Sequence, residues 1–420
     1  MLLVQEYLLN KTFGDLENDH GVSISVDKKG YKFSLNYSQI NSRNSDLLAQ
    51  ECRGLVLSTH DGNPLYCRLD ANGKRHYDKV GPGKTIILAF PMKRFFNYGQ
   101  ESAINIDWND PGLKILEKLD GSLCILYWDQ FSNSWCVSTR SVPEADQLLD
   151  NQLFTFRSLF EKAWLDTMGT VLSAYFYYLN KSCTYCFELT SPYNRIVVNY
   201  PNSRITLLSI RNNETLQEQS LEEDPLVRIA KVPCALSYQF DSIIQLIDLV
   251  STFNPIDHEG VVIRDSHFNR IKVKNALYVA FNKARDSLAT SPRNCLELIL
   301  AEKDDDVISF LPEEISNNLK RIKLGLISVI KQYDEAYTQV LQQANSILLN
   351  DKKTFAITLS SYPKLWRPPF FQRYAGKANN MKDFINLNRK NGTWSDSFLD
   401  QLLSLIKLAG NDDSPSESPA

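Results

Sequence analysis

Lys118 is the residue of this chain whose setting most directly suggests chemistry. It lies in the stretch 113–123, which reads as an apolar strand, an Asp120-Gly121 turn and a second apolar strand. Burial of an ammonium group disfavours its charged form and lowers its pKa, and a neutral lysine is a nucleophile. Lys118 therefore suggests a covalent intermediate, although Lys-x-Asp-Gly also occurs where a surface lysine precedes an ordinary hairpin turn.

Two further lysines stand two residues apart in Arg270-Ile271-Lys272-Val273-Lys274. In a strand, Lys272 and Lys274 point to one face while Ile271 and Val273 face the core. Ammonium groups crowded on one face repel each other unless an anion lies between them, so this pair predicts a phosphate site. Their positive field is also expected to lower the pKa of a nearby lysine.

Two acids interrupt apolar strand segments, Glu188 within 185–189 and Glu259 within 258–263. A carboxylate so flanked is seldom buried without a partner. A structural arginine such as Arg195 would satisfy Glu188 without any function, and a binding role is the alternative.

Basic and aromatic residues also gather nearer the N-terminus. Arg53 leads into an apolar strand and is either a flanking surface charge or a phosphate contact. The segment 90–98 places Lys93 and Arg94 among aromatic residues. It is either a core edge with snorkelling charges or a wall that stacks a base and holds its phosphates.

Composition sets the broad class. A chain of 420 residues suggests two or three domains, and a formal charge of −3 means that any polyanion site must be a local concentration of Lys and Arg. The sequence has no apolar run of about 20 residues and no signal-peptide pattern. Eight cysteines without regular spacing favour reduced thiols in a cytosol. Cys183 and Cys186 would point to opposite faces of a strand, which disfavours a metal or redox role.

The elements that position these residues are mainly strands up to about residue 285. A short helix comes first, and alternating residues predict strands at 21–26 and 31–37. Apolar spacing that includes Leu153, Phe156 and Trp164 predicts an amphipathic helix at 150–178. Helical spacing at 296–300, 315–349 and 398–408 predicts an all-α C-terminal domain. Residues 409–420 read as a disordered tail.

The order of these motifs resembles the covalent nucleotidyltransferase superfamily of ligases and capping enzymes, and more closely the RNA ligase 1 family of T-even bacteriophages. Longer strings carry the resemblance too: Glu51-Cys52-Arg53-Gly54, Pro91-Met92-Lys93-Arg94-Phe95-Phe96-Asn97, Lys118-Leu119-Asp120-Gly121-Ser122-Leu123, Phe187-Glu188 with Asn194-Arg195-Ile196-Val197, Glu259-Gly260, and Lys272-Val273-Lys274 with Tyr278-Val279. The similarity spans most of residues 1–285.

The resemblance implies an α+β fold and an ATP-dependent RNA ligase. It implies an adenylyltransferase domain at 1–285, built on antiparallel sheets with flanking helices, and a helical RNA-specificity domain at 286–408. Lys118 would form lysyl-AMP from ATP with loss of pyrophosphate. AMP would then pass to an RNA 5′-phosphate, and a 3′-hydroxyl would displace it to seal the strand.

The resemblance also implies a role for each matching residue. Lys272 and Lys274 would stabilise charge on the α-phosphate, and Glu188 would bind the ribose hydroxyls. The nucleotide-binding set would further include Arg53, Arg94, Phe96, Glu117 and Glu259. Asp120 and Glu259 would hold Mg²⁺ through water, with Mn²⁺ as a substitute. The acidic run 304–306 is either a helix start favoured by the helix dipole or places Asp305 and Asp306 where they reach the metal. The family carries lysine where this chain has Arg94, which changes the contact geometry.

The expected partners are ATP and RNA with 5′-phosphate and 3′-hydroxyl ends, including broken tRNA. An end-healing kinase-phosphatase is a further expected partner in RNA or tRNA repair. We expect a monomer in the cytoplasm, or in the host-cell cytoplasm if the chain is viral, with no membrane partner.

Two other classes stay open on sequence alone. A capping guanylyltransferase or a DNA ligase shares the Lys-x-Asp-Gly motif, but both normally carry a β-barrel after the paired lysines, where this chain has helical spacing. A non-catalytic RNA-binding relative would be expected to have lost one of Lys118, Glu259 and Lys272, and all three are present.

Overall fold

The computed structural model describes the chain except for residues 39–40, 60–66, 70–74, 78–82, 147, 150–152, 241, 303, 305–307, 309–310, 312, 344–351, 363, 390–393 and 411–420. Contacts divide the chain into two compact units, Met1–Val279 and Ala280–Ala420. Among the described residues, no helix combines the length and the apolar character that crossing a membrane requires.

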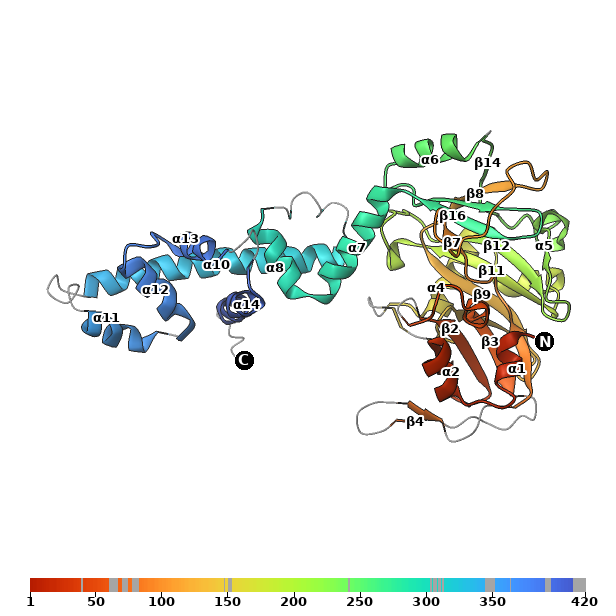
Figure 1. Ribbon diagram of the computed structural model, residues 1–420, viewed down its shortest axis with the longest axis horizontal. Coiled ribbons are helices and arrows are strands. Elements are labelled where there is room, and N and C mark those ends of the chain that lie inside the picture. Colours follow the sequence, from red (N-terminus) through yellow and green to blue (C-terminus); the bar gives the residue numbers. More distant parts are fainter. Residues whose placement is uncertain are drawn as a thin grey trace, which may run out of the picture. The chain divides into compact units, whose positions relative to one another are not determined.

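The first unit combines antiparallel sheets with short helices (Figure 1). Its helices are α1 (Leu3–Tyr7), α2 (Phe13–His20), α3 (Leu47–Glu51), α4 (Phe156–Met168), η1 (Leu172–Tyr178), η2 (Pro192–Asn194), η3 (Leu221–Glu223), α5 (Pro225–Arg228) and α6 (Ile243–Thr252), and α7 (Ala276–Thr290) continues into the second unit.

The described strands of the first unit form four sheets. They are β1 (Val22–Val26), β2 (Lys32–Tyr37), β3 (Arg53–Thr59), β4 (Cys67–Leu69), β5 (Arg75–Tyr77), β6 (Thr85–Ala89), β7 (Phe96–Asn97), β8 (Lys114–Lys118), β9 (Ser122–Asp129), β10 (Ser134–Thr139), β11 (Cys183–Thr190), β12 (Arg204–Asn212), β13 (Glu218–Gln219), β14 (Ser237–Tyr238), β15 (Gly260–Arg264) and β16 (Arg270–Lys274).

Three of these sheets have four or five strands. The first sheet has the order β1-β2-β3-β6, the second β10-β9-β11-β12-β13 and the third β14-β8-β15-β16-β7, and β4 pairs with β5 alone. Neighbouring strands run antiparallel except β16 and β7, which pair in parallel.

Separate apolar cores hold these layers together. Phe13 of α2 and Phe33 of β2 belong to the core of the first sheet and its helices. Phe160 of α4 packs on Phe187 of the second sheet. Leu246 of α6 packs with the β-branched residues of the third sheet, and Figure 1 shows α6 over this sheet. The opposite face of the third sheet is therefore left for polar side chains.

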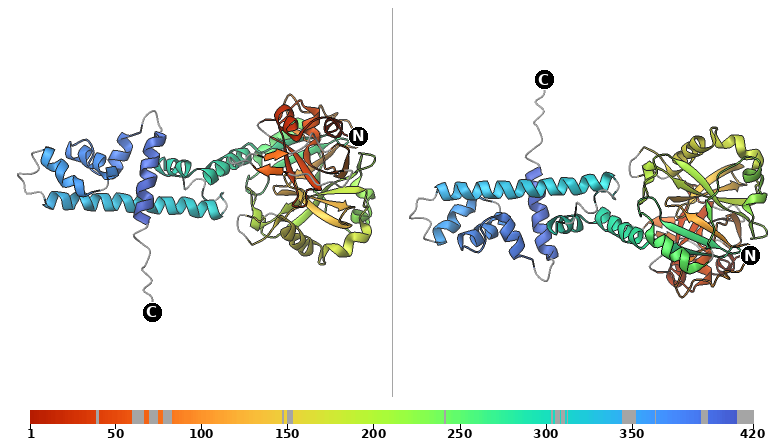
Figure 2. Two further views of the ribbon diagram at one scale, coloured as in Figure 1. Left: turned by 90° about the horizontal axis from the view of Figure 1, so that it is seen from below. Right: turned by 90° about the horizontal axis from the view of Figure 1, so that it is seen from above.

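The second unit is helical throughout its described residues. Its elements are α8 (Pro292–Leu300), α10 (Glu313–Gln343), α11 (Lys352–Thr358), η6 (Leu359–Ser361), η7 (Lys364–Trp366), α12 (Arg367–Tyr374), α13 (Met381–Leu387) and α14 (Asp396–Gly410). Figure 2 shows α14 crossing the long helix α10. Gly325 permits this crossing, because a Cβ there would lie 2.5 Å from the Cγ2 atom of Ile406.

The fold class predicted from the sequence, α+β with antiparallel sheets and a helical C-terminal region, is confirmed in these terms. The strands predicted at 21–26 and 31–37 are β1 and β2. The helix predicted within 150–178 is shorter, because Thr155 caps its start and Gly169 ends it in a left-handed conformation with φ 74°. Leu153 was predicted in the apolar stripe of that helix, but it lies outside the helix and is exposed.

The strand pair around Lys118 is not a hairpin. β8 belongs to the third sheet and β9 to the second, so the Asp120-Gly121 turn carries the chain from one sheet to the other. The interpretation of Lys-x-Asp-Gly as an ordinary hairpin turn is therefore wrong. Cys183 and Cys186 do point to different cores, as their spacing in a strand predicts, and both thiols are free.

Candidate active site

Three adjacent strands of the third sheet present a regular grid of side chains to the second sheet. Gly260 on β15 is paired with Lys118 on β8 and with Lys274 on β16. Two residues further along β15, Val262 is paired with Leu116 on β8 and with Lys272 on β16. Because alternate residues of a strand share a face, the basic residues of these strands gather on one side of the sheet.

The last row of the same grid is basic throughout. Arg264 is paired with Lys114 and with Arg270. Lys114 forms an ion pair with Glu222, and Arg270 forms one with Glu218. Sequence reasoning missed this row, although the alternation that singled out Lys272 and Lys274 extends to Arg270.

Lys118 and Lys274 share one carboxylate. The Nζ atom of Lys118 lies 2.6 Å from Oε2 of Glu259, and that of Lys274 lies 2.7 Å from Oε1. Glu259 is only 3% exposed, so its charge acts on both lysines with little screening by water. The β15–β16 pairing requires Gly260 here, because a Cβ would lie 2.1 Å from the carbonyl oxygen of Val273, and φ is 148°.

Glu188 on β11 faces this group from the second sheet. Its Oε1 accepts a hydrogen bond from the backbone N–H of Gly121 at 3.0 Å. Burial raises the pKa of Glu188 to about 7, an effect that Lys118 and Arg53 oppose. Arg195, considered as a structural partner for Glu188, instead donates to the carbonyl oxygen of Val197.

The protonation of the lysines differs from the sequence prediction. Burial alone would lower the pKa of Lys118, but Glu259 and Glu188 outweigh burial and raise it above its usual value. The pKa that falls is that of Lys272, to about 7, through burial and the charges of Lys274 and Lys118. The expected depression of the Lys118 pKa is therefore wrong for the free protein, because the nearest charge to Lys118 is a carboxylate.

Asp120 makes contacts that sequence reasoning did not anticipate. Its Oδ2 accepts hydrogen bonds from the backbone N–H groups of Val197 and Val198, at 2.9 and 2.8 Å. Its Oδ1 accepts one from the hydroxyl of Tyr278 at 2.7 Å. A carboxylate offers about four lone-pair positions, and three are used here. Asp120 thus connects the loop after Lys118 to the 195–198 segment and to α7.

One cavity includes Lys118, and a larger cavity borders the first. A cavity of about 170 Å³ is lined by Lys118, Glu117, Glu188, Arg53 and Phe95, among others. A second cavity of about 590 Å³ shares Phe95 and Arg270 with it.

The predicted nucleotide contacts divide between these cavities. Arg94 and Phe96 line the larger cavity and do not line the one that contains Lys118. Phe96 is buried in β7, and the guanidinium of Arg94 lies over the rings of Tyr37 and Phe96. Phe95 is an aromatic residue beside the lysines, and its ring lies 5.3 Å from both the guanidinium of Arg53 and the Nζ of Lys272. Its position next to Phe96 in the sequence was the available signal, although β7 begins only at Phe96.

Comparison with known proteins identifies the family. A sequence model of RNA ligases of the T4 RNA ligase 1 type matches residues 51–278. The chain belongs to this RNA ligase family. The family predicted from the motifs is confirmed.

Individual relatives in this and related groups are distant. A protein of Autographa californica nuclear polyhedrosis virus, named as a bifunctional polynucleotide kinase/RNA ligase, is 26% identical over 80% of this chain. The chain spans 44% of the length of that relative. An RNA ligase of Rhodothermus phage RM378 is 25% identical over 70% of this chain and 79% of its own.

Solved structures of RNA ligases are also similar to the chain. Form 2 of an archaeal ATP-dependent RNA ligase covers 96% of this chain and 98% of its own at 13% identity, with a TM-score of 0.42. A Naegleria gruberi RNA ligase variant, solved with ATP and Mn, covers 61% of this chain and 92% of its own at 11% identity, with a TM-score of 0.33.

The remaining predicted site residues lie in the second unit. Asp305 and Asp306, predicted to reach the metal, fall outside the described residues. Their neighbour Asp304 is buried and forms an ion pair with Lys323 at 2.6 Å within that unit. The described residues after β16 contain helices and no strand, so no β-barrel of the kind expected for capping enzymes and DNA ligases is present among them.

Proposed function

We propose that this family member is an ATP-dependent RNA ligase that joins RNA 5′-phosphate and 3′-hydroxyl ends through lysyl-AMP on Lys118 and an adenylylated RNA end. The observation that carries the proposal is the cluster of Lys118, Glu188, Glu259, Lys272 and Lys274 at the junction of two sheets. A nucleophile, two acids and a pair of cations are the groups that phosphoryl-type transfer requires.

In the first step, the Nζ of Lys118 attacks the α-phosphorus of ATP. A P–N bond forms, the bond from the α-phosphorus to the bridging oxygen breaks, and pyrophosphate leaves. Lys118 gives up two ammonium protons in the overall step. Lys272 and Lys274, on the same face of β16, neutralise the negative charge that builds up on the α-phosphate.

Deprotonation of Lys118 depends on Glu259. In the free protein the carboxylate of Glu259 lies 2.6 Å from Lys118 and favours its ammonium form. The donor set fits Mg²⁺, because Glu259 supplies carboxylate oxygens that can accept from metal-bound water. Glu259 would hold the ion through water, and the positive charge of Mg²⁺ would weaken the interaction of Glu259 with the Lys118 proton. Asp120 is the weaker candidate, since three protein donors already occupy its carboxylate.

The other assigned residues bind the nucleotide. Glu188 accepts hydrogen bonds from the ribose hydroxyls, a role that suits an acceptor-only carboxylate. Arg53 faces the outgoing phosphates, and Glu117 lines the same cavity. Arg94 and Phe96 line the larger cavity. There they contact the parts of the nucleotide that lie beyond the α-phosphate.

The physiological substrate follows from the family resemblance alone. We propose RNA repair, with broken tRNA as the substrate, the helical unit as the part that selects it, and an end-healing kinase-phosphatase acting upstream. Asp305 and Asp306 remain candidates for the metal set.

Covalent labelling tests the proposed chemistry. The protein is incubated with Mg²⁺ and either α-labelled ATP or α-labelled GTP, separated under denaturing conditions and mapped by peptide. We expect label from ATP alone, on the peptide that contains Lys118, and none in Lys118→Ala. Label from GTP would indicate a capping enzyme. Absence of label after prior pyrophosphate treatment, which removes AMP already bound, would favour a non-catalytic RNA-binding protein.

A further inference from the structure

The cavity of about 590 Å³ is built from donor and aromatic side chains. Lys93, Arg94, Arg211, Phe95, Phe96 and Phe268 are among the residues that line it. Its volume is in the range of cavities that hold a molecule of nucleotide size. The combination of cations and aromatic rings is typical of single-stranded nucleic-acid sites, where phosphates are neutralised and bases stack.

The charges of this cavity leave donors without acceptors. Glu218 is the one acid among its described lining residues, and both Arg211 and Arg270 pair with it. Nη1 of Arg94 and Nε of Arg211 are buried with no hydrogen-bond partner among the described residues. Buried donors of this kind are costly unless an acceptor arrives. The cavity therefore suits an anionic ligand rich in acceptors.

Phe268 enters this cavity from the hairpin that joins β15 to β16. Its φ is 63°, in the left-handed region that a bulky residue seldom adopts. Strain of this kind persists only where the surroundings enforce it, and it gathers at functional sites. The ring of Phe268 lines the cavity and lies 5.0 Å from the guanidinium of Arg264.

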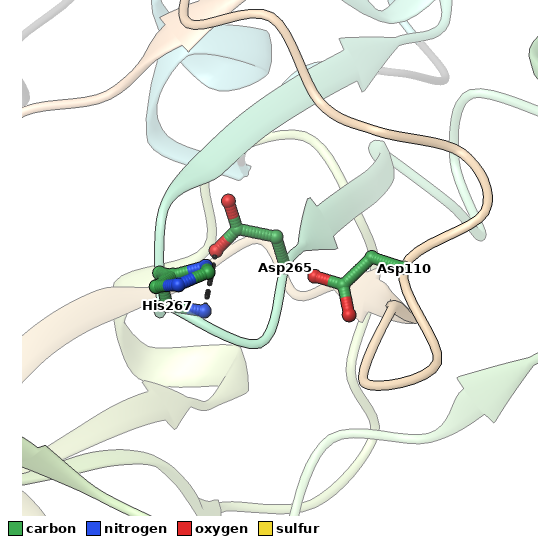
Figure 3. A group of neighbouring side chains, drawn as sticks. All are labelled: Asp110, Asp265 and His267. Carbon is green, nitrogen blue, oxygen red and sulfur yellow. Dashed lines mark hydrogen bonds between the residues drawn. The ribbon is translucent and has the colours of Figure 1, made fainter.

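Two carboxylates enforce this strained hairpin. Oδ1 of Asp265 accepts hydrogen bonds from the backbone N–H groups of His267 and Asn269, at 2.9 and 2.7 Å. Asp110 reaches the same hairpin from a distant loop and accepts from the N–H of Ser266 at 2.7 Å. Figure 3 shows Asp110, Asp265 and His267 gathered at this turn. Their hydrogen bonds to the hairpin explain the grouping, so we do not assign a metal ion to it.

The cavity also lies in the direction from which a second substrate must approach. The order β8-β15-β16-β7 puts Lys118 on one strand, the paired lysines two strands away, and Phe96 on the strand beyond. β8 and β7 are therefore three strand spacings apart, which is about 14 Å across the sheet. Displacement at phosphorus is in line, so the group that displaces Lys118 from AMP enters on the side away from Lys118. That side leads past Lys272 and Phe95 into the larger cavity.

We propose that this cavity holds the 5′-terminal nucleotide of the RNA strand that receives AMP, with its base stacked on Phe268. This inference rests on the proposed ligase function. In the step concerned, an oxygen of the RNA 5′-phosphate attacks the α-phosphorus of lysyl-AMP. A P–O bond forms, the P–N bond breaks, and the released lysine nitrogen takes up protons from water.

Single-turnover transfer of AMP tests the proposal. Purified lysyl-AMP protein is mixed with increasing concentrations of a 5′-phosphorylated oligoribonucleotide whose 3′ end is blocked. We expect Phe268→Ala to raise the half-saturating donor concentration about tenfold, as loss of one stacking partner does, and Phe268→Tyr to stay near the wild type. Phe131→Ala is the matched control, because Phe131 is exposed in the turn between β9 and β10 and lines neither cavity.

A second measurement keeps the proposal testable if Phe268→Ala does not fold. A donor that lacks its 5′-terminal base should bind the wild type about tenfold more weakly. If Phe268→Ala folds, it should show no additional loss with this donor. An unchanged donor dependence in Phe268→Ala, or a change confined to the 3′-hydroxyl strand, would overturn the assignment. Failure of the wild type to form lysyl-AMP would instead refute the proposed function.

Discussion

Replacement of Lys272 by methionine is expected to stabilise the free protein while impairing formation of lysyl-AMP. Lys272 lies beside Lys274 and Lys118 in a partly buried site, and its pKa falls from 10.5 to about 7. Folding therefore places this side chain where its charged form is disfavoured. Methionine keeps most of the apolar stem and removes the charge.

The size of the effect follows from linkage between proton binding and folding. Each pKa unit corresponds to 1.36 kcal/mol, so the difference of about 3.5 pKa units destabilises the wild type by at most about 5 kcal/mol at pH 6. Between pH 7 and 10.5 the unfolded chain holds a proton on Lys272 that the folded protein lacks, so the wild type becomes more stable as pH rises. At pH 9 the remaining penalty is about 2 kcal/mol.

Urea unfolding at pH 6 and pH 9 measures this difference. Lys272→Met should be more stable than the wild type at both pH values, with the larger gain at pH 6. Lys29→Met, at an exposed lysine in the turn between β1 and β2, is the matched control and should change little at either pH. A Lys272→Met protein that is less stable at pH 6, or a gain that does not shrink by pH 9, would refute the reasoning.

Three further predictions concern the same site. Gly260→Ala places a Cβ 2.1 Å from the Val273 carbonyl oxygen. It should lower the free energy of unfolding by about 3 kcal/mol in urea and abolish lysyl-AMP formation in the labelling assay. A stable, active variant would contradict this. Asp120→Asn should lower the free energy of unfolding by about 1–3 kcal/mol in the absence of Mg²⁺, because an amide cannot accept all three hydrogen bonds. A melting curve that differs from that of the wild type only when Mg²⁺ is present would favour the metal role instead. The rate of lysyl-AMP formation should rise with pH from 7 to 9, because the raised pKa of Lys118 keeps its amine protonated. Lys272 stays charged over this interval when ATP is bound, because the adjacent phosphate favours its ammonium form. A rate that falls from pH 7 to 9 at saturating ATP would count against Lys118 as the group that must lose a proton.

Much of the site could be predicted because a strand has a period of two. The alternation in 270–274 predicted Lys272 and Lys274 on one face and Ile271 and Val273 in the core, and the structure confirms this arrangement. The roles of Arg94 and Phe96 were harder to predict. Arg94 precedes β7 and Phe96 begins it, and only the tertiary structure brings both against the larger cavity.

The sequence by itself determined the family and, in strands such as 270–274, which residues share a face, since motif order and alternation are properties of the chain. Only the tertiary structure decided which residues meet. Lys118 and Glu259 are 141 residues apart, and the pairing of β8 with β15 brings them to 2.6 Å. The protonation of Lys118 and Lys272 depends on this arrangement, because Coulomb energies depend on distances in space and desolvation depends on burial.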